Sequence, residues 1–356
     1  MPLFSLHLTV DSLPSFNSSS VSAARFTFSL FYIKIKIMKK NYFVRNGMMA
    51  LAALTLIGSA TSCKKKNDPA PNTLVEVAAS AGLTSLVATV EAAGLTNTLR
   101  GPGPFTVFGP TNAAFTAAAI PANTPVATLQ SVLLYHVFDG KVLAAAVPTT
   151  LTAIASKNAT TDTLYVKRVG NDVFVNGQRV TTANAEASNG VAHVIGRVLI
   201  PAGGRNIVQI AVAAAPALDS LVRAVTLASA GTAAGSPDNI AEVLSNINGA
   251  TVFAPTNQAF TDLLAQLGVT SLSQVSVATL RQVLRHHVVA GARVFSNDVA
   301  PGNVATASGT SATIAISGGN ATIKGNAANS ATATIVATDI MAKNGVVHLI
   351  NKVILP

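Results

Sequence analysis

The chain has 356 residues, of which 49% are hydrophobic and 11% charged, and its formal net charge is +10. The length allows two or three domains, and the apolar fraction supplies ample surface for cores built from Val, Leu, Ile and Ala, with no Trp. Residues 1–68 carry nine basic and two acidic residues and therefore contribute +7 to the net charge of +10. The remaining chain therefore lacks the basic excess of a nucleic-acid-binding domain, and we expect no nucleic-acid partner.

The chain begins with a segment that contains the pattern of a secretion signal. Residues 38–45 are basic, 47–57 form an apolar stretch too short to span a bilayer, and 58–62 are small residues that lead to Cys63. This order predicts a signal peptide over 38–62. Residues 1–37 are rich in Ser and Phe and fit no such pattern, so we expect Met38 to be the true start and 1–37 to be a mis-assigned upstream extension.

Cys63 is the only cysteine, so it cannot form an intramolecular disulfide. A basic start, an apolar run and small residues that end at one cysteine resemble a bacterial lipoprotein signal, cleaved before Cys63 with lipid added to its sulfur. The alternative is a free thiol behind an ordinary signal peptide. We expect 63–71 to be a lipid anchor and flexible tether, and the protein to be a membrane-anchored lipoprotein of the bacterial cell envelope, at the outer membrane or cell surface.

A first domain is predicted over 72–201. Apolar residues are spaced as in helices over 74–90 and again over 126–137. Between them, Phe105 to Phe108 reads as a buried strand that Pro110 ends, and Thr111 or Asn112 is placed to cap a following helix with Phe115 directed into the core. From Thr163 the apolar period becomes two, and Asn176-Gly177 indicates a two-residue hairpin. The closing strand is expected within 189–201.

The same patterns occur a second time. Residues 105–115 return as 250–260, and the segment 189–201 returns as 344–356. The offsets are 145 and 155, so the second copy carries ten more residues between its two patterns, which connecting loops tolerate. This predicts a second domain over 205–356, with a helix over 206–215, helical spacing over 277–288 and a meander of short strands over 312–336.

These paired segments resemble the two sequence blocks of the fasciclin domain. The family carries a Tyr-His pair between its blocks, matched by Tyr135-His136 in the first domain and replaced by His286-His287 in the second. The resemblance implies an α+β protein with two fasciclin-like domains. Each would be a wedge-shaped β-sandwich with helices packed along one side, used outside the cell for adhesion.

Two interpretations apply to the candidate site residues. His136 and His287 are either buried imidazoles bonded to backbone groups or, with Tyr135, part of a partner-binding surface, as the resemblance suggests. An Asp-Ile pair before the second block is implicated in integrin binding by animal members of the family, and Asp339-Ile340 matches it. Its alternative is a solvated turn aspartate beside a packing isoleucine. The equivalent positions in the first domain are Asn184 and Ala185.

Catalytic patterns are missing from the sequence. It has no nucleophile elbow, no phosphate-binding glycine loop and no zinc-binding helix motif, and its Asp and Glu residues are scattered. His193 and His348 lie in the predicted closing strands, where structural histidines are expected. We therefore predict no enzyme, no cofactor and no metal site.

The sequence thus favours a lipid-anchored cell-envelope protein for adhesion or extracellular-matrix binding, acting through non-catalytic protein or polysaccharide contacts, as in a biofilm. Its membrane contact would be the lipid on Cys63, and self-association is left open. The first alternative is a carrier of an apolar small molecule held between helices and sheet. A less favoured one is a hydrolase of envelope polysaccharides, which would require two carboxylates within about 10 Å in a cleft.

Overall fold

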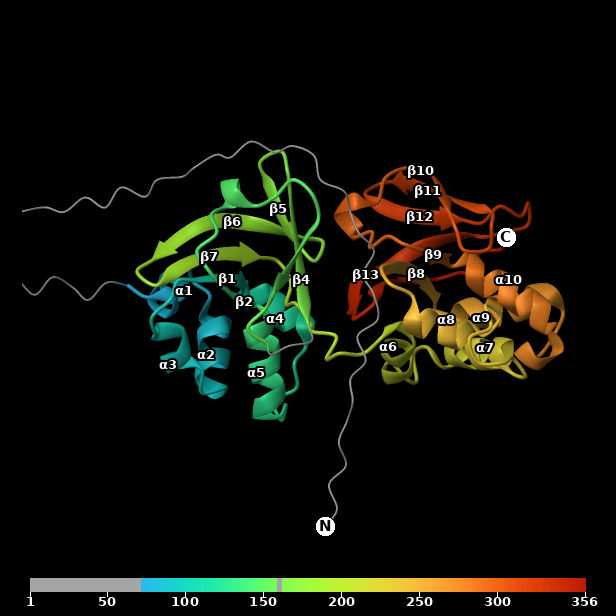
Figure 1. Cartoon of the computed structure of the whole chain (residues 1–356), viewed down its shortest axis with the longest axis horizontal. Coiled ribbons are helices and arrows are strands. Elements are labelled where there is room, and N and C mark those ends of the chain that lie inside the picture. Colours follow the sequence, from blue (N-terminus) through green and yellow to red (C-terminus); the bar gives the residue numbers. More distant parts are fainter. Residues whose placement is uncertain (1–71, 159–161) are drawn as a thin grey trace, which may run out of the picture. The chain divides into compact units, whose positions relative to one another are not determined.

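The computed structural model describes residues 72–158 and 162–356, which belong to one compact unit. The predicted upstream extension 1–37, the signal peptide 38–62 and the tether 63–71 with Cys63 lie outside the described residues. The described chain has two halves, each with its own sheet and its own helices (Figure 1).

The first half begins with helices and ends with strands. Its helices are α1 (Leu74–Ser80), α2 (Thr84–Ala92), α3 (Thr96–Arg100), α4 (Asn112–Ala118), α5 (Val126–Tyr135) and the short 3-10 helix η1 (Ala144–Ala146). Its strands are β1 (Phe105–Pro110), β2 (Val137–Asp139), β3 (Thr152–Ala155), β4 (Thr163–Val169), β5 (Asp172–Val175), β6 (Gln178–Ala187) and β7 (Gly190–Ile195).

The second half repeats this order. Its helices are α6 (Ile207–Ala213), α7 (Asp219–Ser229), α8 (Ile240–Asn246), α9 (Asn257–Leu267) and α10 (Val277–His286), with the short 3-10 helices η2 (Leu272–Gln274) and η3 (Ser296–Asp298). Its strands are β8 (Ala250–Pro255), β9 (Val288–Val289), β10 (Gly302–Ala305), β11 (Ser311–Ser317), β12 (Asn320–Lys324), β13 (Thr332–Ala342) and β14 (Gly345–Ile350).

Both sheets have the same topology. The strand order is β2-β1-β7-β6-β5-β4-β3 in the first half and β9-β8-β14-β13-β12-β11-β10 in the second. In each sheet the two repeated sequence patterns are neighbouring parallel strands, with Phe105 opposite Gly190 and Ala250 opposite Gly345. The other strand pairs are antiparallel. The internal duplication is therefore a duplication of the whole fold, and the α+β class is confirmed as two barrel-like sheets, each with helices.

The central strands are buried on both faces, which explains their continuous apolar sequence. Every residue of β1 and β7 is buried. Val107 packs with residues of α1, α2 and α3 in one hydrophobic cluster, whereas the adjacent Phe108 packs on the opposite face with Leu164, Val175 and Ile195. Each half consequently has one core between helices and sheet and another enclosed by the strands.

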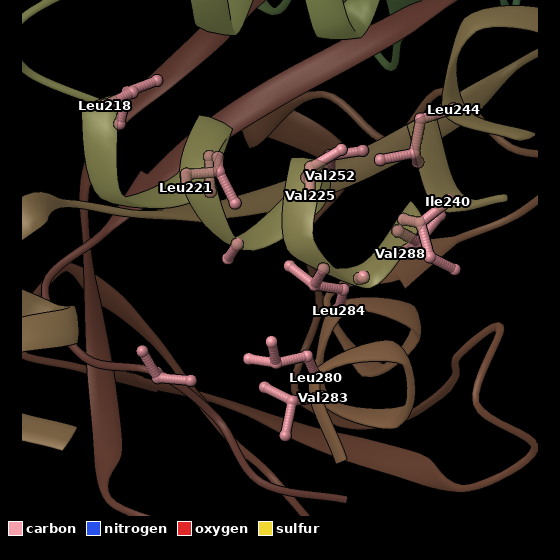
Figure 2. Packing of buried hydrophobic residues seen from close by; sticks show 14 of the residues in the cluster. Leu218, Leu221, Val225, Ile240, Leu244, Val252, Leu280, Val283, Leu284 and Val288 are labelled. Atoms are coloured by element: carbon pink, nitrogen blue, oxygen red, sulfur yellow. The ribbon is translucent and has the colours of Figure 1, made fainter. Parts of the chain in front are cut away.

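The helix–sheet core of the second half is shown in Figure 2. Leu221 and Val225 from α7 face Val252 of β8, and Leu280 and Leu284 come from α10. The helices are thus packed on the sheet mainly by aliphatic side chains, as the composition predicted.

The helix cap and the hairpin turn that the sequence predicted are both present. The Thr111 side chain accepts a hydrogen bond from Ala114 N at 3.2 Å and caps α4, and Asn176-Gly177 connects β5 to β6 with both residues at positive φ. Phe115 is partly buried against two clusters. The helix predicted over 126–137 ends earlier, at Tyr135, because the chain turns at His136 to begin β2.

The two halves contact each other within the compact unit. The rings of Tyr165 and Phe295 lie 5.9 Å apart between centroids, and the Arg293 guanidinium lies 4.9 Å from the Tyr165 ring centroid. An ion pair joins Lys167 Nζ to Asp298 Oδ1 at 2.7 Å. The pair is more than two-thirds buried on both sides and therefore helps to fix the junction.

Candidate functional site

His136 is the C-cap residue of α5 and is 2% exposed. Its Nδ1 donates to the carbonyl oxygen of Val132 at 2.8 Å, and its Nε2 accepts from the backbone N–H of Leu199 at 2.9 Å. These two bonds require the neutral tautomer with its proton on Nδ1. Burial lowers the pKa of His136 to about 4, against the effect of the Val132 hydrogen bond.

Tyr135 lies in the strand-enclosed core and is 1% exposed. Its hydroxyl donates to Thr163 O at 3.0 Å and accepts from Asn176 Nδ2 at 2.9 Å. Asn176 sits in the β5–β6 turn at φ 44°, and its Oδ1 accepts from Tyr165 N at 2.8 Å. Burial raises the pKa of Tyr135, so it remains a neutral hydroxyl that fixes the turn.

His287 repeats the arrangement of His136. Its Nδ1 donates to Val283 O at 2.7 Å, and its Nε2 accepts from Ile354 N at 3.1 Å. Burial lowers the pKa of His287 to about 4 as well. The prediction of buried imidazoles bonded to backbone groups is therefore confirmed for His136 and His287.

His286 replaces Tyr135 in the second half and makes different contacts. It is fully buried, and its Nδ1 lies 3.0–3.1 Å from the hydroxyls of Thr306, Ser308 and Thr310. Its Nε2 has no hydrogen-bond partner among the described residues. The tyrosine hydroxyl that fixes a turn in the first half is thus replaced by a cluster of side-chain hydroxyls around an imidazole.

The burial of Tyr135, His136 and His287 bears on their predicted partner-binding role. All three are at most 2% exposed, and their polar atoms have internal partners. They cannot touch a partner directly in this folded state. Any influence on binding would act through the turn and the chain segments that they hold.

His193 and His348 are equivalent structural histidines. Each accepts from a backbone N–H through Nδ1 at 3.3 Å, from Asn184 in one half and Asp339 in the other. Each Nε2 donates to a backbone carbonyl at 2.9 Å. Their pKa values are lowered by burial, and their bonds support the strand bulges that precede them.

Asp339 lies in a bulge of β13, where the register shifts between Ala337 and Ile340, and its φ is 61°. Its Oδ1 accepts from Ser296 N at 2.8 Å, and its Oδ2 accepts from Ser296 Oγ at 2.5 Å and from Gln178 Nε2 at 3.1 Å. Asp339 is therefore a half-buried bulge residue with structural hydrogen bonds, in place of the solvated turn aspartate that the alternative interpretation assumed.

Asn184 occupies the same bulge in the first half. Its φ is also 61°, and its Oδ1 accepts from Ala144 N at 2.8 Å. The bulge is thus a common feature of both halves, and a side-chain oxygen at this position holds the loop that follows the β2 or β9 strand. The carboxylate charge and the neighbouring Ile340 belong to the second half alone.

Asp339 and Ile340 line a cleft of about 300 Å³ that includes residues of both halves. Its wall also contains Gln178, Arg197 and Arg205, none of which was singled out from the sequence. Comparison of the two sequence copies could have drawn attention to Arg197. Its counterpart Lys352 bonds to Asp262, and the position that corresponds to Asp262 in the first half is Ala117.

Potential metal ligands do not gather in the described part of the chain. Residues 72–158 and 162–356 contain no group of three or more His, Cys, Asp or Glu side chains placed to hold a metal ion. Five pockets formed by these residues are each lined by at most one Asp or Glu side chain. No helix in the same residues is long and apolar enough to cross a membrane.

Comparison with known proteins places these features in context. A model of the fasciclin domain family matches residues 81–201 and 224–356. Protein sll1483 of Synechocystis sp. is 43% identical over 138 residues, which are 36% of this chain and 73% of that protein.

Animal proteins match a longer part of the chain. Transforming growth factor-beta-induced protein ig-h3 of Sus scrofa is 28% identical over 267 residues, which are 72% of this chain and 35% of that protein. Periostin of Homo sapiens is 26% identical over 273 residues, which are 75% of this chain and 30% of that protein. The chain thus spans about a third of the length of these two relatives.

One solved structure with a similar chain is the FAS1 domain pair from the insect cell adhesion molecule fasciclin I. Its sequence identity is 15% and its TM-score 0.36, over 77% of this chain and 97% of that chain.

Proposed function

The chain belongs to the fasciclin domain family, and we propose on this basis that it is a lipid-anchored adhesion protein of the bacterial cell envelope. Fasciclin domains are associated with cell adhesion and matrix binding, a non-catalytic role. The proposed protein binds an extracellular protein or polysaccharide by surface complementarity. A lipid on Cys63 would hold it at the membrane, and residues 64–71 would give both domains reach.

The observation that carries this proposal is how the repeated unit uses its ionisable side chains. Four of the five buried histidines in the described residues serve as hydrogen-bonding groups for the backbone, and His136 and His287 do so through both ring nitrogens. A duplicated scaffold in which these four buried imidazoles support its own chain favours binding over a reaction. Asp339 and Ile340 are proposed to contribute to binding as part of the cleft wall.

Adhesion can be tested in cells of the source bacterium. Deletion of the gene is expected to reduce surface attachment and biofilm cohesion, and expression of the full chain should restore both. Unchanged attachment and cohesion after deletion would contradict the adhesion role.

The lipid anchor has its own test. Cys63→Ala is expected to abolish incorporation of a labelled fatty acid and to release the protein from the membrane fraction. Ser62→Ala is the matched control, because it keeps the thiol and a small residue before it, and it should remain lipidated. Retention of Cys63→Ala in the membrane fraction would argue against this anchor.

A carrier of an apolar small molecule is the second candidate function, and one cavity favours it. A space of about 130 Å³ lies between α6, α7, α8 and β8, and Leu221, Leu244 and Leu284 are among its walls (Figure 2). The equivalent space in the first half is only about 30 Å³. Apolar cavities of about 150 Å³ can bind a molecule of benzene size.

Native mass spectrometry of the purified chain tests the carrier. A retained ligand should be lost when Ala241, on the wall of this cavity, is changed to Leu, which fills the space. Ala278 lines a different pocket, on α10, so Ala278→Leu is the control. A chain that never carries bound mass from its native envelope would exclude this function.

A further inference from the structure

The cleft beside Asp339 has the features of a binding site. Its volume is about 300 Å³, at the lower end of the range of about 300–1,000 Å³ found for ligand pockets, and such pockets occur preferentially between domains. Aliphatic side chains form much of its wall, including Leu199, Ile200, Ile210 and Met341. Ile200 is 53% exposed, so its side chain is accessible to a ligand in the cleft.

Two guanidinium groups in the wall have no carboxylate partner among the described residues. Arg197 donates through Nη1 to the carbonyl oxygen of Thr338 at 2.9 Å, and Arg205 donates through Nε to that of Ala202 at 2.9 Å. Both Arg side chains are absent from the ion pairs of residues 72–158 and 162–356. Each guanidinium has five N–H donors, so each retains donors that can bind an anionic group.

The repeat shows that the free charge of Arg197 is specific to the first half. Lys352, its counterpart, forms an ion pair with Asp262 on α9. Ala117 stands at the corresponding position of α4, where no charge can pair with Arg197. The unpaired cation therefore faces the cleft in only one of two otherwise equivalent positions.

The one carboxylate in the cleft wall is already engaged. Asp339 accepts hydrogen bonds from Ser296 and from Gln178, which are neutral donors. Its charge offsets one of the two guanidinium groups, and the cleft keeps a net positive charge. An anionic ligand with apolar neighbours matches both the charge and the aliphatic wall.

We propose that this cleft binds an acidic segment of an extracellular protein, with a carboxylate on Arg197 or Arg205 and flanking aliphatic side chains on the Leu199–Ile210 wall. The proposal rests on the proposed function in taking the ligand from a partner protein. A polysaccharide is a poorer match, because the lining residues include no aromatic ring on which a sugar ring could stack.

The test uses the purified full chain, labelled with ¹⁵N, and a probe peptide, acetyl-Leu-Glu-Ile-amide. Its binding is expected to shift the amide resonances of 197–205 and 338–341. Acetyl-Leu-Gln-Ile-amide, which lacks the charge, should bind about fivefold more weakly. Equal affinity of the two peptides, or shifts confined to other residues, would overturn the proposal.

Matched variants test whether Arg197 and Arg205 bind the carboxylate of the peptide. Arg197→Gln and Arg205→Gln together are expected to weaken binding of the acidic peptide at least about fivefold and to leave the neutral peptide unchanged. Arg223→Gln removes an exposed guanidinium on α7 outside the cleft and should have no effect. An equal loss in the double variant and in Arg223→Gln would indicate a non-specific charge effect and contradict the site.

Two further outcomes distinguish failure of the cleft proposal from failure of the proposed adhesion function. If a trimer of galacturonic acid shifts the cleft amides and the acidic peptide does not, the partner class is wrong. If the deletion strain loses surface attachment while neither probe binds, the adhesion role stands and the cleft is not its site.

Discussion

The imidazole of His136 accepts a hydrogen bond from the backbone N–H of Leu199 at 2.9 Å, across 63 positions of sequence. His287 does the same for Ile354 at 3.1 Å. In each half, one neutral histidine joins the end of a helix to the segment that follows the last strand. Each half thus has its own buried polar link between its helices and its sheet.

Removal of this link should destabilise the first half strongly. His136→Ala is expected to lower the free energy of unfolding by about 3 kcal/mol, because it leaves the buried Leu199 N–H without an acceptor and creates a cavity. Urea denaturation of the full chain measures the loss. Thr128→Ala, an exposed change on the same helix, should be close to neutral. A cost below about 1 kcal/mol for His136→Ala would show that water or a neighbour replaces the imidazole.

Acid should weaken the fold through the same histidines. The pKa of His136 and of His287 is lowered to about 4 from an ordinary value near 6.5. Between these values the unfolded chain binds protons that the folded chain does not. The free energy of unfolding therefore falls as pH decreases from about 6.5 to 4, by up to about 3 kcal/mol per imidazole.

The measurement is the free energy of unfolding at several pH values from 8 to 4. These two groups contribute no further loss below about pH 4, where both states are protonated. His136→Gln and His287→Gln should each reduce the slope between pH 6.5 and 4, whatever their stability at pH 8. An unchanged slope in both variants would mean that other groups dominate acid unfolding.

Much of the local structure was predictable because short-range chemistry determines it. Thr111 caps a helix, and Asn176-Gly177 makes a hairpin turn, since each needs only neighbours in sequence. The parallel pairing of Phe105 with Gly190 was not predictable, because it joins residues 85 positions apart that no local pattern connects. Repetition identified the two strands as important without showing that they are adjacent.

The candidate site was less predictable than the fold. The burial of Tyr135 follows from a bond to Thr163 and a turn at Asn176, neither of which its sequence neighbours reveal. The bulge at Asp339 breaks the alternation of β13, so its side chain could not be assigned to a face. Arg197 became recognisable as an unpaired charge only when the contact between Lys352 and Asp262 was known.

The glycines at the start of the closing strands should tolerate no side chain. A Cβ at Gly190 would overlap the carbonyl oxygen of Phe105, and one at Gly345 would overlap that of Ala250. Gly190→Ala and Gly345→Ala are each expected to cost about 4 kcal/mol or more, because the clash is with the paired strand.

Hydrogen exchange measured by mass spectrometry can assign each loss to its half. Gly190→Ala should increase exchange in β1 and β7, and Gly345→Ala should do so in β8 and β14. Gly196→Ala is the control, since a Cβ there meets nothing within 4 Å, and it should stay within about 0.5 kcal/mol of the natural chain. Normal protection of β1 in Gly190→Ala would contradict the parallel pairing.

Asparagine at position 339 should preserve the fold, and alanine should not. Asn184 holds the equivalent bulge at the same φ of 61° with an amide oxygen, so Asp339→Asn can keep the bond from Ser296 N. Asp339→Ala leaves that N–H without an acceptor and places alanine at a positive φ. We expect a loss of about 2 kcal/mol for the alanine variant and less than about 1 kcal/mol for asparagine, measured by urea denaturation.

The same pair of variants decides what the carboxylate does for binding. If the cleft binds an acidic segment, Asp339→Asn removes a like charge, and the affinity for acetyl-Leu-Glu-Ile-amide should rise by about twofold. If the carboxylate itself contacts a cationic group of the partner, attachment of cells should fall in Asp339→Asn although the protein is as stable as before. A rise in peptide affinity with intact attachment would assign Asp339 to the scaffold of the cleft, and Arg197 and Arg205 to recognition.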